Sequence, residues 1–355
     1  MDPERYEQLM DLFDEVCDAT VEEQRAVVAD LASRDGELAR RLAALLEHDG
    51  KDTAVVEAAF HPGAAARALA DDLRDDEHDA LGNKRRDGAR VGDWLVEEKL
   101  GSGGVGTVHR AVHAQRGEVA AIKFLMQSAV GDPNDVRRFQ REFKAIARLS
   151  HPAVLEVFEQ GEGPLGHYFV MEYVPGGDLR RLGGATVAVL LPLFVAVAEA
   201  LHYVHGQGIV HRDLKPANVL LTDDDPPRPK LADFGIAKVI DATAIITGTG
   251  AVMGSIDFMA PEQINGQPAT VRSDLYAFGC TLFSSLTNAP LFPGDNFERL
   301  YARLKGSAPS LRDRRADAPP ELDALCSRLL SPTPEARPAG FEEVIALLRG
   351  LTPST

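Results

Sequence analysis

Cysteine is scarce in this chain of 355 residues. Cys17, Cys280 and Cys326 are the only three, and long stretches of sequence separate them. That number and spacing exclude a disulfide framework and a metal site built from paired cysteines. We therefore expect a protein of the reducing cytoplasm.

Long apolar runs are missing as well. No stretch of 18 or more consecutive apolar residues occurs, and the chain opens with acidic rather than basic residues. A membrane span and a secretory signal are therefore not expected. Hydrophobic residues make up 45% of the chain and charged residues 26%, the balance of a folded globular protein.

Basic side chains are few in the first 80 residues, which carry 22 acidic against 8 basic groups, a balance of −14. The other 275 residues carry 32 acidic and 30 basic groups, a balance of −2. Because an acidic segment repels nucleic acids and anionic membranes, we expect neither as a partner. Solubility alone explains this charge as well as recruitment of a basic partner does, and both interpretations stay open.

Apolar residues at three- and four-residue steps predict short helices in residues 1–73. Thr20 and Glu23 have the spacing of a capping box, and Asp35 is placed to cap the next helix. Since each helix has one apolar side, we predict a small all-α bundle that serves as a regulatory or interaction module. The charged residues 74–90, which lack periodicity, form the predicted linker to a second domain at 91–350.

The second domain opens with a glycine-rich segment of the pattern G-x-G-x-x-G-x-V. It comprises Leu100, Gly101, Ser102, Gly103, Gly104, Val105, Gly106 and Val108. Glycines let a backbone approach phosphate oxygens closely, but a dinucleotide-binding fold shows the same spacing. Here a strand-like stretch follows the glycines, whereas a dinucleotide fold would continue into a helix.

One lysine, Lys123, interrupts the apolar strand-like residues 120–125. Such a lysine more often lies at a sheet edge with its ammonium group in water. Residues 138–149 then form an amphipathic stretch in which Glu142 lies beside the apolar stripe, within reach of a buried lysine. The alternative for Glu142 is an exposed pair with Arg138 or Arg141, which would stabilise the helix little.

The strongest signal is the run from His211 to Asn218, HRDLKPAN, followed fifteen residues later by Asp233-Phe234-Gly235. Phosphoryl transfer needs a carboxylate near the attacking hydroxyl, a cation along the phosphate and oxygen ligands for Mg²⁺. Asp213, Lys215, Asn218 and Asp233 supply these groups on predicted loops between strands.

From about residue 91 to 349 the chain resembles the eukaryotic-like (Hanks-type) bacterial serine/threonine protein kinases. The resemblance rests on the ordered set GSGGVG, AAIK, the RE pair that ends in Glu142, HRDLKPAN, DFG, APE at 260–262 and SDLYAFG at 273–279. It implies an α+β, two-lobed kinase fold preceded by the helical bundle. The small β-rich lobe would span residues 91–172 and the helical large lobe residues 175–350, with ATP between them.

The resemblance also implies roles for single residues. Lys123 would hold the α- and β-phosphates and pair with Glu142. Asp213 would be the catalytic base, Lys215 would lie along the γ-phosphate, and Asn218 and Asp233 would bind Mg²⁺, which Mn²⁺ could replace.

Further positions would form the adenine site. Met171 stands at the gatekeeper position, and the backbone of Glu172, Tyr173 and Val174 would form the hinge that receives adenine. Val108, Ala121 and Leu220 would sandwich the ring, although each is equally well explained as ordinary core.

The family pattern extends to structural positions. Glu262 and Arg337 would form an ion pair, and Asp274 would steady the catalytic loop. Gly254-Ser255 stands where the family usually has Gly-Thr, a mild departure because serine keeps the hydroxyl. Arg212 before Asp213 marks kinases that are switched by phosphorylation, and we predict autophosphorylation at Thr247 or Thr249. Each could equally be a loop threonine without a role.

The expected activity is transfer of the ATP γ-phosphate to serine or threonine hydroxyls of protein substrates. A pseudokinase or scaffold would have lost Lys123, Asp213 or Asp233, and all three are present. A small-molecule phosphotransferase would lack the long loop that ends in Ala-Pro-Glu. The acidic N-terminal module could bind a partner protein or dock on the kinase lobes, and the sequence leaves the oligomeric state open.

Overall fold

The computed structural model describes residues 19–36, 88–103, 106–125, 143–163, 165–234, 256–294, 296–305 and 308–351, with seven single positions between 12 and 46. The chain divides into two compact units, Met1–Gly82 and Asn83–Thr355. Of the predicted linker 74–90, residues 74–87 lie outside the described residues. β1 (Arg90–Val91) begins at the last residue of the predicted linker, one residue before the predicted start of the kinase domain.

The first unit contains α2 (Val21–Arg34), whose N-terminus is capped as the sequence predicts. The Thr20 backbone N–H donates to Glu23 Oε2 over 2.9 Å, and the Glu23 N–H donates to Thr20 Oγ1 over 3.4 Å. Asp35 Oδ1 accepts from the Leu38 N–H over 3.1 Å, which confirms the second predicted cap. Leu38, Leu42 and Leu46 are buried, as one apolar helix face requires.

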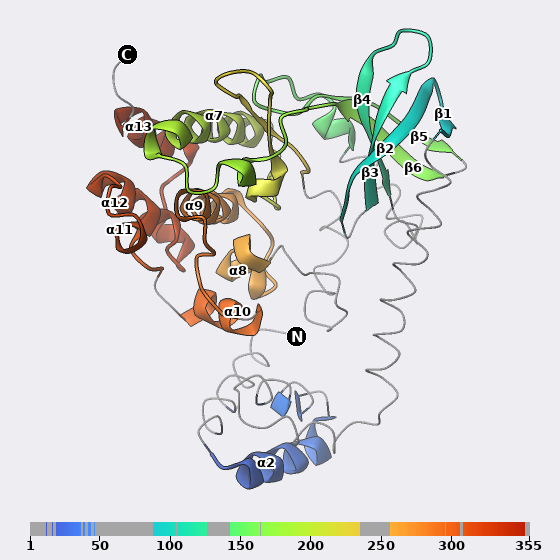
Figure 1. Cartoon of the computed structure of the whole chain (residues 1–355). Coiled ribbons are helices and arrows are strands. Elements are labelled where there is room, and N and C mark those ends of the chain that lie inside the picture. The colour runs from blue at the N-terminus through green and yellow to red at the C-terminus, as the bar shows by residue number, and fades with distance from the viewer. Residues whose placement is uncertain are drawn as a thin grey trace. The chain divides into compact units, whose positions relative to one another are not determined.

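The second unit begins with a small lobe built on an antiparallel sheet of six strands in the described residues (Figure 1). The strands follow the order β1-β2-β3-β4-β6-β5. After β1 they comprise β2 (Trp94–Gly103), β3 (Gly106–His113), β4 (Val119–Leu125), β5 (Val157–Gly163) and β6 (Gly166–Glu172). Residues 143–146 are helical, and this helix ends three residues before the predicted limit at Leu149. The Leu149 N–H donates to the Ile146 carbonyl oxygen over 2.9 Å, so a tighter three-residue turn replaces the next α-helical bond.

The large lobe is mainly helical and also carries a two-stranded sheet of β7 (Val219–Leu221) and β8 (Pro229–Leu231). Its α-helices are α7 (Val187–Gly206), α8 (Pro261–Ile264), α9 (Val271–Thr287), α10 (Asn296–Lys305), α11 (Leu311–Arg314), α12 (Pro320–Leu329) and α13 (Phe341–Leu351). Short 3₁₀ turns lie at η2 (Leu179–Leu182), η3 (Pro216–Asn218), η4 (Ile256–Phe258) and η5 (Pro334–Ala336). Asn218 therefore ends a 3₁₀ turn rather than lying in an open loop.

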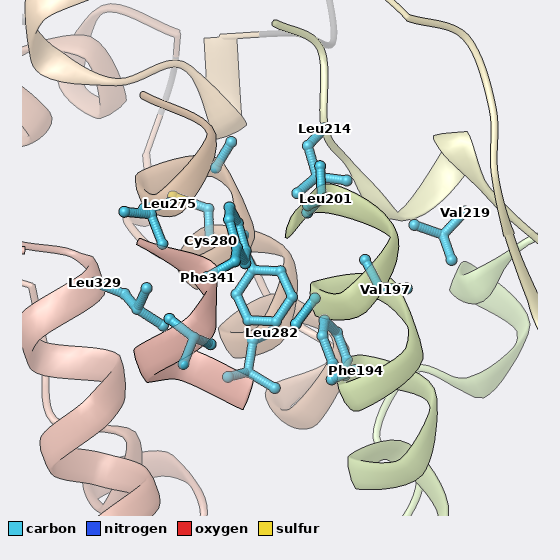
Figure 2. Close-up of a cluster of buried hydrophobic side chains, with 14 of the residues drawn as sticks. Phe194, Val197, Leu201, Leu214, Val219, Leu275, Cys280, Leu282, Leu329 and Phe341 are labelled. Carbon is cyan, nitrogen blue, oxygen red and sulfur yellow. The ribbon is translucent and has the colours of Figure 1, made fainter. Parts of the chain in front are cut away.

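The large-lobe core forms where α7, α9, α12 and α13 meet (Figure 2). Phe278 of α9 packs edge-on against Phe194 of α7 at 5.5 Å and against Phe341 of α13 at 5.3 Å. Among the described helices, α7 alone has the length and apolar composition to cross a membrane, and half of that stretch is buried inside the protein. A helix that is apolar on most sides is also what the centre of a large core requires.

Candidate active site

The small-lobe sheet positions Lys123 by the alternation of strand β4. Ala120, Ile122 and Phe124 face one apolar cluster together with Trp94, whereas Ala121 and Leu125 face another. Because side chains alternate along a strand, Lys123 shares the face of Ala121 and Leu125. In the sheet it pairs with Val108 of β3 and Phe169 of β6.

The second apolar cluster gathers the side chains that the sequence assigns to adenine. Val108, Ala121, Met171, Val174 and Leu220 all belong to it or pack against it. The first three come from small-lobe strands, whereas Leu220 comes from β7 of the large lobe. The cluster therefore joins the two lobes at the place predicted for the nucleotide base.

The glycine-rich segment forms the hairpin between β2 and β3, with Gly103 paired to Gly106. A Cβ at Gly106 would lie 1.8 Å from the carbonyl oxygen of Phe124, so only glycine fits there. At Gly106 the β3 backbone therefore packs closely against the backbone of β4, the strand that carries Lys123. Gly104 and Val105 lie outside the described residues.

In the large lobe, the Asp213 carboxylate lies at the centre of the predicted catalytic loop. Lys215 Nζ lies 3.0 Å from Asp213 Oδ2, and Asn218 Nδ2 lies 3.1 Å from the same oxygen. Asn218 Nδ2 also donates to the Asp213 carbonyl oxygen over 2.7 Å. The Asn218 amide nitrogen is thus engaged by Asp213, which leaves the amide oxygen as the ligand-type atom of that side chain.

Lys123 and Asp233 come from opposite lobes and meet directly. Lys123 Nζ lies 2.6 Å from Asp233 Oδ1, although 110 positions separate the two residues in the chain. Asp233 has a φ of 53°, a left-handed conformation that is uncommon outside glycine and marks a constrained backbone. The preceding residue is fixed to the catalytic loop, because the Ala232 N–H donates to the Asn218 carbonyl oxygen over 2.8 Å.

Asp274 of α9 binds the backbone of the catalytic loop. Its Oδ2 accepts from the His211 N–H over 2.7 Å, and its Oδ1 accepts from the Arg212 N–H over 2.9 Å. His205 Nε2 lies 2.8 Å from Asp274 Oδ2. Arg212 adopts a φ of 68°, a left-handed conformation held here by the bond to Asp274. The carboxylate is 1% exposed, so these contacts replace its lost hydration.

His211 occupies the interior between this loop and Asp233. Its Nε2 lies 3.1 Å from the Ala232 carbonyl oxygen, and its ring packs 4.8 Å from the ring of Phe234. Burial lowers the pKa of His211, although Asp274 and Asp213 act in the opposite direction. A neutral imidazole that donates to the Ala232 carbonyl fits this surrounding.

Glu262 and Arg337 form the predicted ion pair inside the large lobe, with two contacts of 2.7 and 2.8 Å. Burial raises the pKa of Glu262, but the hydrogen bonds and charge of Arg337 outweigh it and lower the pKa below its usual value. The pair joins α8 to the segment that follows η5, at a distance from the cleft groups.

Several predicted site residues cannot be placed. Glu142, Thr247 and Thr249 lie outside the described residues, as does Gly235. Gly254 and Ser255 lie outside them too. Leu100, Gly101 and Ser102 lie on β2, and Leu100 is one of its exposed residues, with 42% of its surface accessible.

The donor set suits magnesium. Asn218 offers an amide oxygen, and Asp233 offers a carboxylate that is partly exposed while contacting Lys123 through Oδ1. No group of three or more His, Cys, Asp or Glu side chains that could hold a metal occurs among the residues with described positions. Mg²⁺ does not need such a cage, because it keeps waters and binds substrate phosphates alongside one or two protein oxygens.

The protein kinase domain family matches residues 94–346, which include every cleft residue placed above. The chain belongs to the protein kinase family. Its structure is similar to the crystal structure of the PknI kinase domain of Mycobacterium tuberculosis, with a TM-score of 0.60 and 31% identity. That similarity covers 74% of this chain and 97% of the other.

Curated relatives point to the same branch of the family. The chain is 37% identical over 265 residues to a probable serine/threonine-protein kinase of Streptomyces coelicolor, covering 71% of this chain and 39% of the relative. It is 36% identical to PknB of Mycolicibacterium smegmatis, covering 69% and 40%, and 35% identical to PknL of Mycobacterium tuberculosis, covering 72% and 63%. The prediction of a eukaryotic-like bacterial serine/threonine kinase domain is confirmed. The match spans less than two thirds of the length of each of these relatives.

Three contacts in this region were not predicted. Sequence reasoning assigned no role to His205, His211 or Lys230, yet each makes a partly or fully buried polar contact near the cleft. Their partners lie between 21 and 69 positions away in the sequence. No local pattern reports such pairs, since only the fold brings them together.

Proposed function

We propose that the protein transfers the γ-phosphate of ATP to serine and threonine hydroxyls of protein substrates. The observation that carries this proposal is the approach of Lys123 from the small lobe to within 2.6 Å of Asp233 in the large lobe. A lysine that could bind phosphate and a carboxylate that could bind metal thus meet between the lobes. Ala232, which precedes Asp233 and belongs to the apolar adenine cluster, is bonded to Asn218 of the catalytic loop.

The chain's own groups divide the work of the reaction. Lys123 would orient the α- and β-phosphates, and Lys215 would lie along the γ-phosphate. The substrate hydroxyl oxygen would bond to the γ-phosphorus while the bond between that phosphorus and the ADP oxygen breaks. The Asp213 carboxylate would accept the hydroxyl proton. Mg²⁺, held by Asn218 and Asp233, would neutralise phosphate charge. The catalysis is therefore positioning and electrostatic stabilisation.

The test is transfer of radiolabelled γ-phosphate to a generic basic protein by the full chain, with Asp213→Asn as the variant. Loss of the base should lower turnover by about 10²–10⁴-fold while ATP affinity stays within about twofold. Near-normal turnover in Asp213→Asn would refute the assigned role, and no transfer by the unaltered protein would favour the pseudokinase or scaffold.

The same labelled protein tests autophosphorylation. Phosphate at Thr247 or Thr249 would add charge that an arginine beside Asp213 can bind, and Arg212 stands at that position. Phosphopeptide mapping should recover one of these threonines from the active protein and neither from Asp213→Asn. Label confined to other positions would reject both assignments.

We also infer that the acidic N-terminal unit acts as a regulatory or partner-binding module within the cytoplasm. Its charge balance of −14 over residues 1–80 and its capped helix α2 support a folded segment that attracts basic proteins. A chain of residues 83–355, the second compact unit, should phosphorylate a basic substrate with a higher KM than the full chain if the module recruits it. If the full chain and residues 83–355 had the same KM and the same kcat on both a basic and a neutral substrate, recruitment and autoinhibition would both be contradicted.

A further inference from the structure

An ion pair joins the end of β6, at the proposed hinge, to β8, the strand that leads to Asp233. Lys230 Nζ lies 2.9 Å from Glu172 Oε2. Glu172 ends β6 at the hinge, whereas Lys230 lies in β8, three residues before Asp233. Only 18% of the Lys230 side chain and 27% of the Glu172 side chain are exposed, so water screens this pair less than a surface pair.

The Glu172 end is fixed to the small lobe by further bonds. Its carboxylate accepts from the Glu156 N–H over 3.2 Å, and its own N–H donates to the Glu156 carbonyl oxygen over 2.9 Å. β6 is also paired on both sides, with β4 and with β5. The hinge backbone therefore keeps its local shape without Lys230.

The Lys230 end is bonded on one side to the small-lobe segment beside Glu156 and on the other side to the catalytic loop. Leu231 donates to the Ala153 carbonyl oxygen over 2.8 Å and accepts from the Leu155 N–H over 3.0 Å. The next residue, Ala232, donates to the Asn218 carbonyl oxygen over 2.8 Å. Lys230 therefore lies in a short segment that is bonded both to the small lobe and to Asn218, and that leads directly to Asp233.

Two other titratable side chains, His151 and Glu199, lie near Lys230, but Lys230 is bonded to Glu172. Burial lowers the pKa of the nearby His151, Glu199 raises it, and the positive charge of Lys230 lowers it further. The lowered pKa keeps His151 neutral at physiological pH, so it adds no second positive charge beside Lys230. Glu199 itself binds Arg349 of α13 at 2.6 Å.

We propose that the Glu172–Lys230 pair is a positioning device that holds the adenine-binding hinge in register with the metal-binding Asp233. This inference rests on the placement of ATP under the proposed function. Neither side chain touches the reacting atoms. Beside the backbone bonds, the pair adds a charged contact between the two halves of the site, so it favours a ligand that occupies both halves at once.

That role predicts a selective loss of affinity in Lys230→Met, which keeps the aliphatic stem and removes the charge. Adenosine probes the hinge alone, magnesium tripolyphosphate probes the metal end alone, and Mg·ATP spans both. We expect Mg·ATP to bind about 5–10-fold more weakly, with the other two ligands within about twofold of the unaltered protein. In kinetics KM for ATP rises while kcat and KM for the protein substrate change little.

Matched variants separate this role from a general loss of stability. Lys230→Arg keeps the cation and should retain Mg·ATP affinity, and Glu172→Gln should reproduce the loss. The double variant Glu172→Gln/Lys230→Met should bind no more weakly than either single one. Arg228→Met breaks an exposed pair with Asp224 in the same hairpin and should leave all three affinities unchanged.

The outcomes are distinct. Unchanged Mg·ATP affinity in Lys230→Met, or an equal weakening of adenosine and Mg·ATP, would overturn the positioning role while leaving the kinase proposal intact. Failure of the unaltered protein to bind either adenosine or Mg·ATP would overturn the proposed function together with this inference. Each result follows from isothermal titration of the folded full-length chain.

Discussion

Asp274 and His211 set the shape of the catalytic loop at the scale of single residues. One carboxylate of α9 contacts two backbone N–H groups and one imidazole, and it lies 1% exposed in the large-lobe interior. Its contacts hold Arg212 in a left-handed conformation directly before Asp213. A buried carboxylate with this many donors is a rigid support, because losing any donor leaves charge uncompensated.

The buried His211 makes stability depend on pH. Its pKa in the folded protein lies below the value of 6.5 in the unfolded chain. Below pH 6.5 the unfolded chain binds a proton that the folded protein does not, so stability is complete above that pH and falls as the pH drops. The loss approaches about 1.4 kcal/mol per pH unit while only the unfolded state is protonated.

Urea unfolding at pH 7.5, 6.5 and 5.5 checks this expectation against His211→Phe, which keeps the ring against Phe234 and cannot titrate. The variant should be less stable at pH 7.5 by about 1–3 kcal/mol, since the Ala232 carbonyl loses its donor. Its stability should then fall less steeply with pH than that of the unaltered protein. Parallel curves for the two proteins would contradict the neutral buried state of His211.

At the scale of elements, the local patterns of the sequence predicted much of what the structure shows. The capping box at Thr20 and Glu23 gave the start of α2 correctly. The apolar run around Lys123 predicted strand β4, and the strand-like stretch expected after the glycines is β3. These features depend on neighbours within a few residues, so the sequence alone contains the physical cause.

Elements whose position depends on distant partners were predicted less well. Residues 143–146 are helical but the helix does not reach Leu149, and Asn218 ends a 3₁₀ turn that the sequence pattern did not indicate. The Glu172–Lys230 pair spans 58 positions and the His205–Asp274 contact spans 69. Charge complementarity at such separations is too common in a sequence to single out a pair.

At the scale of the whole kinase unit, the site depends on two lobes that share an apolar cluster. The small lobe contributes Lys123 through a strand with apolar clusters on both faces, and the large lobe contributes Asp213, Asn218 and Asp233 around a helical core. The resemblance predicted that Lys123 pairs with Glu142, which lies outside the described residues, and that Asp213, Asn218 and Asp233 belong to one site. The residues alone did not fix that Lys123 contacts Asp233 directly.

The central claim is that these groups surround one nucleotide and its divalent ion. The most direct measurement is a crystal structure of the full chain with Mg²⁺ and a non-hydrolysable ATP analogue. The account predicts phosphates bound to Lys123, the cation bound to Asn218 and Asp233, and adenine between Ala121 and Leu220. A nucleotide bound elsewhere, with Lys123 and Asp233 still in contact and the apolar cluster closed, would contradict it.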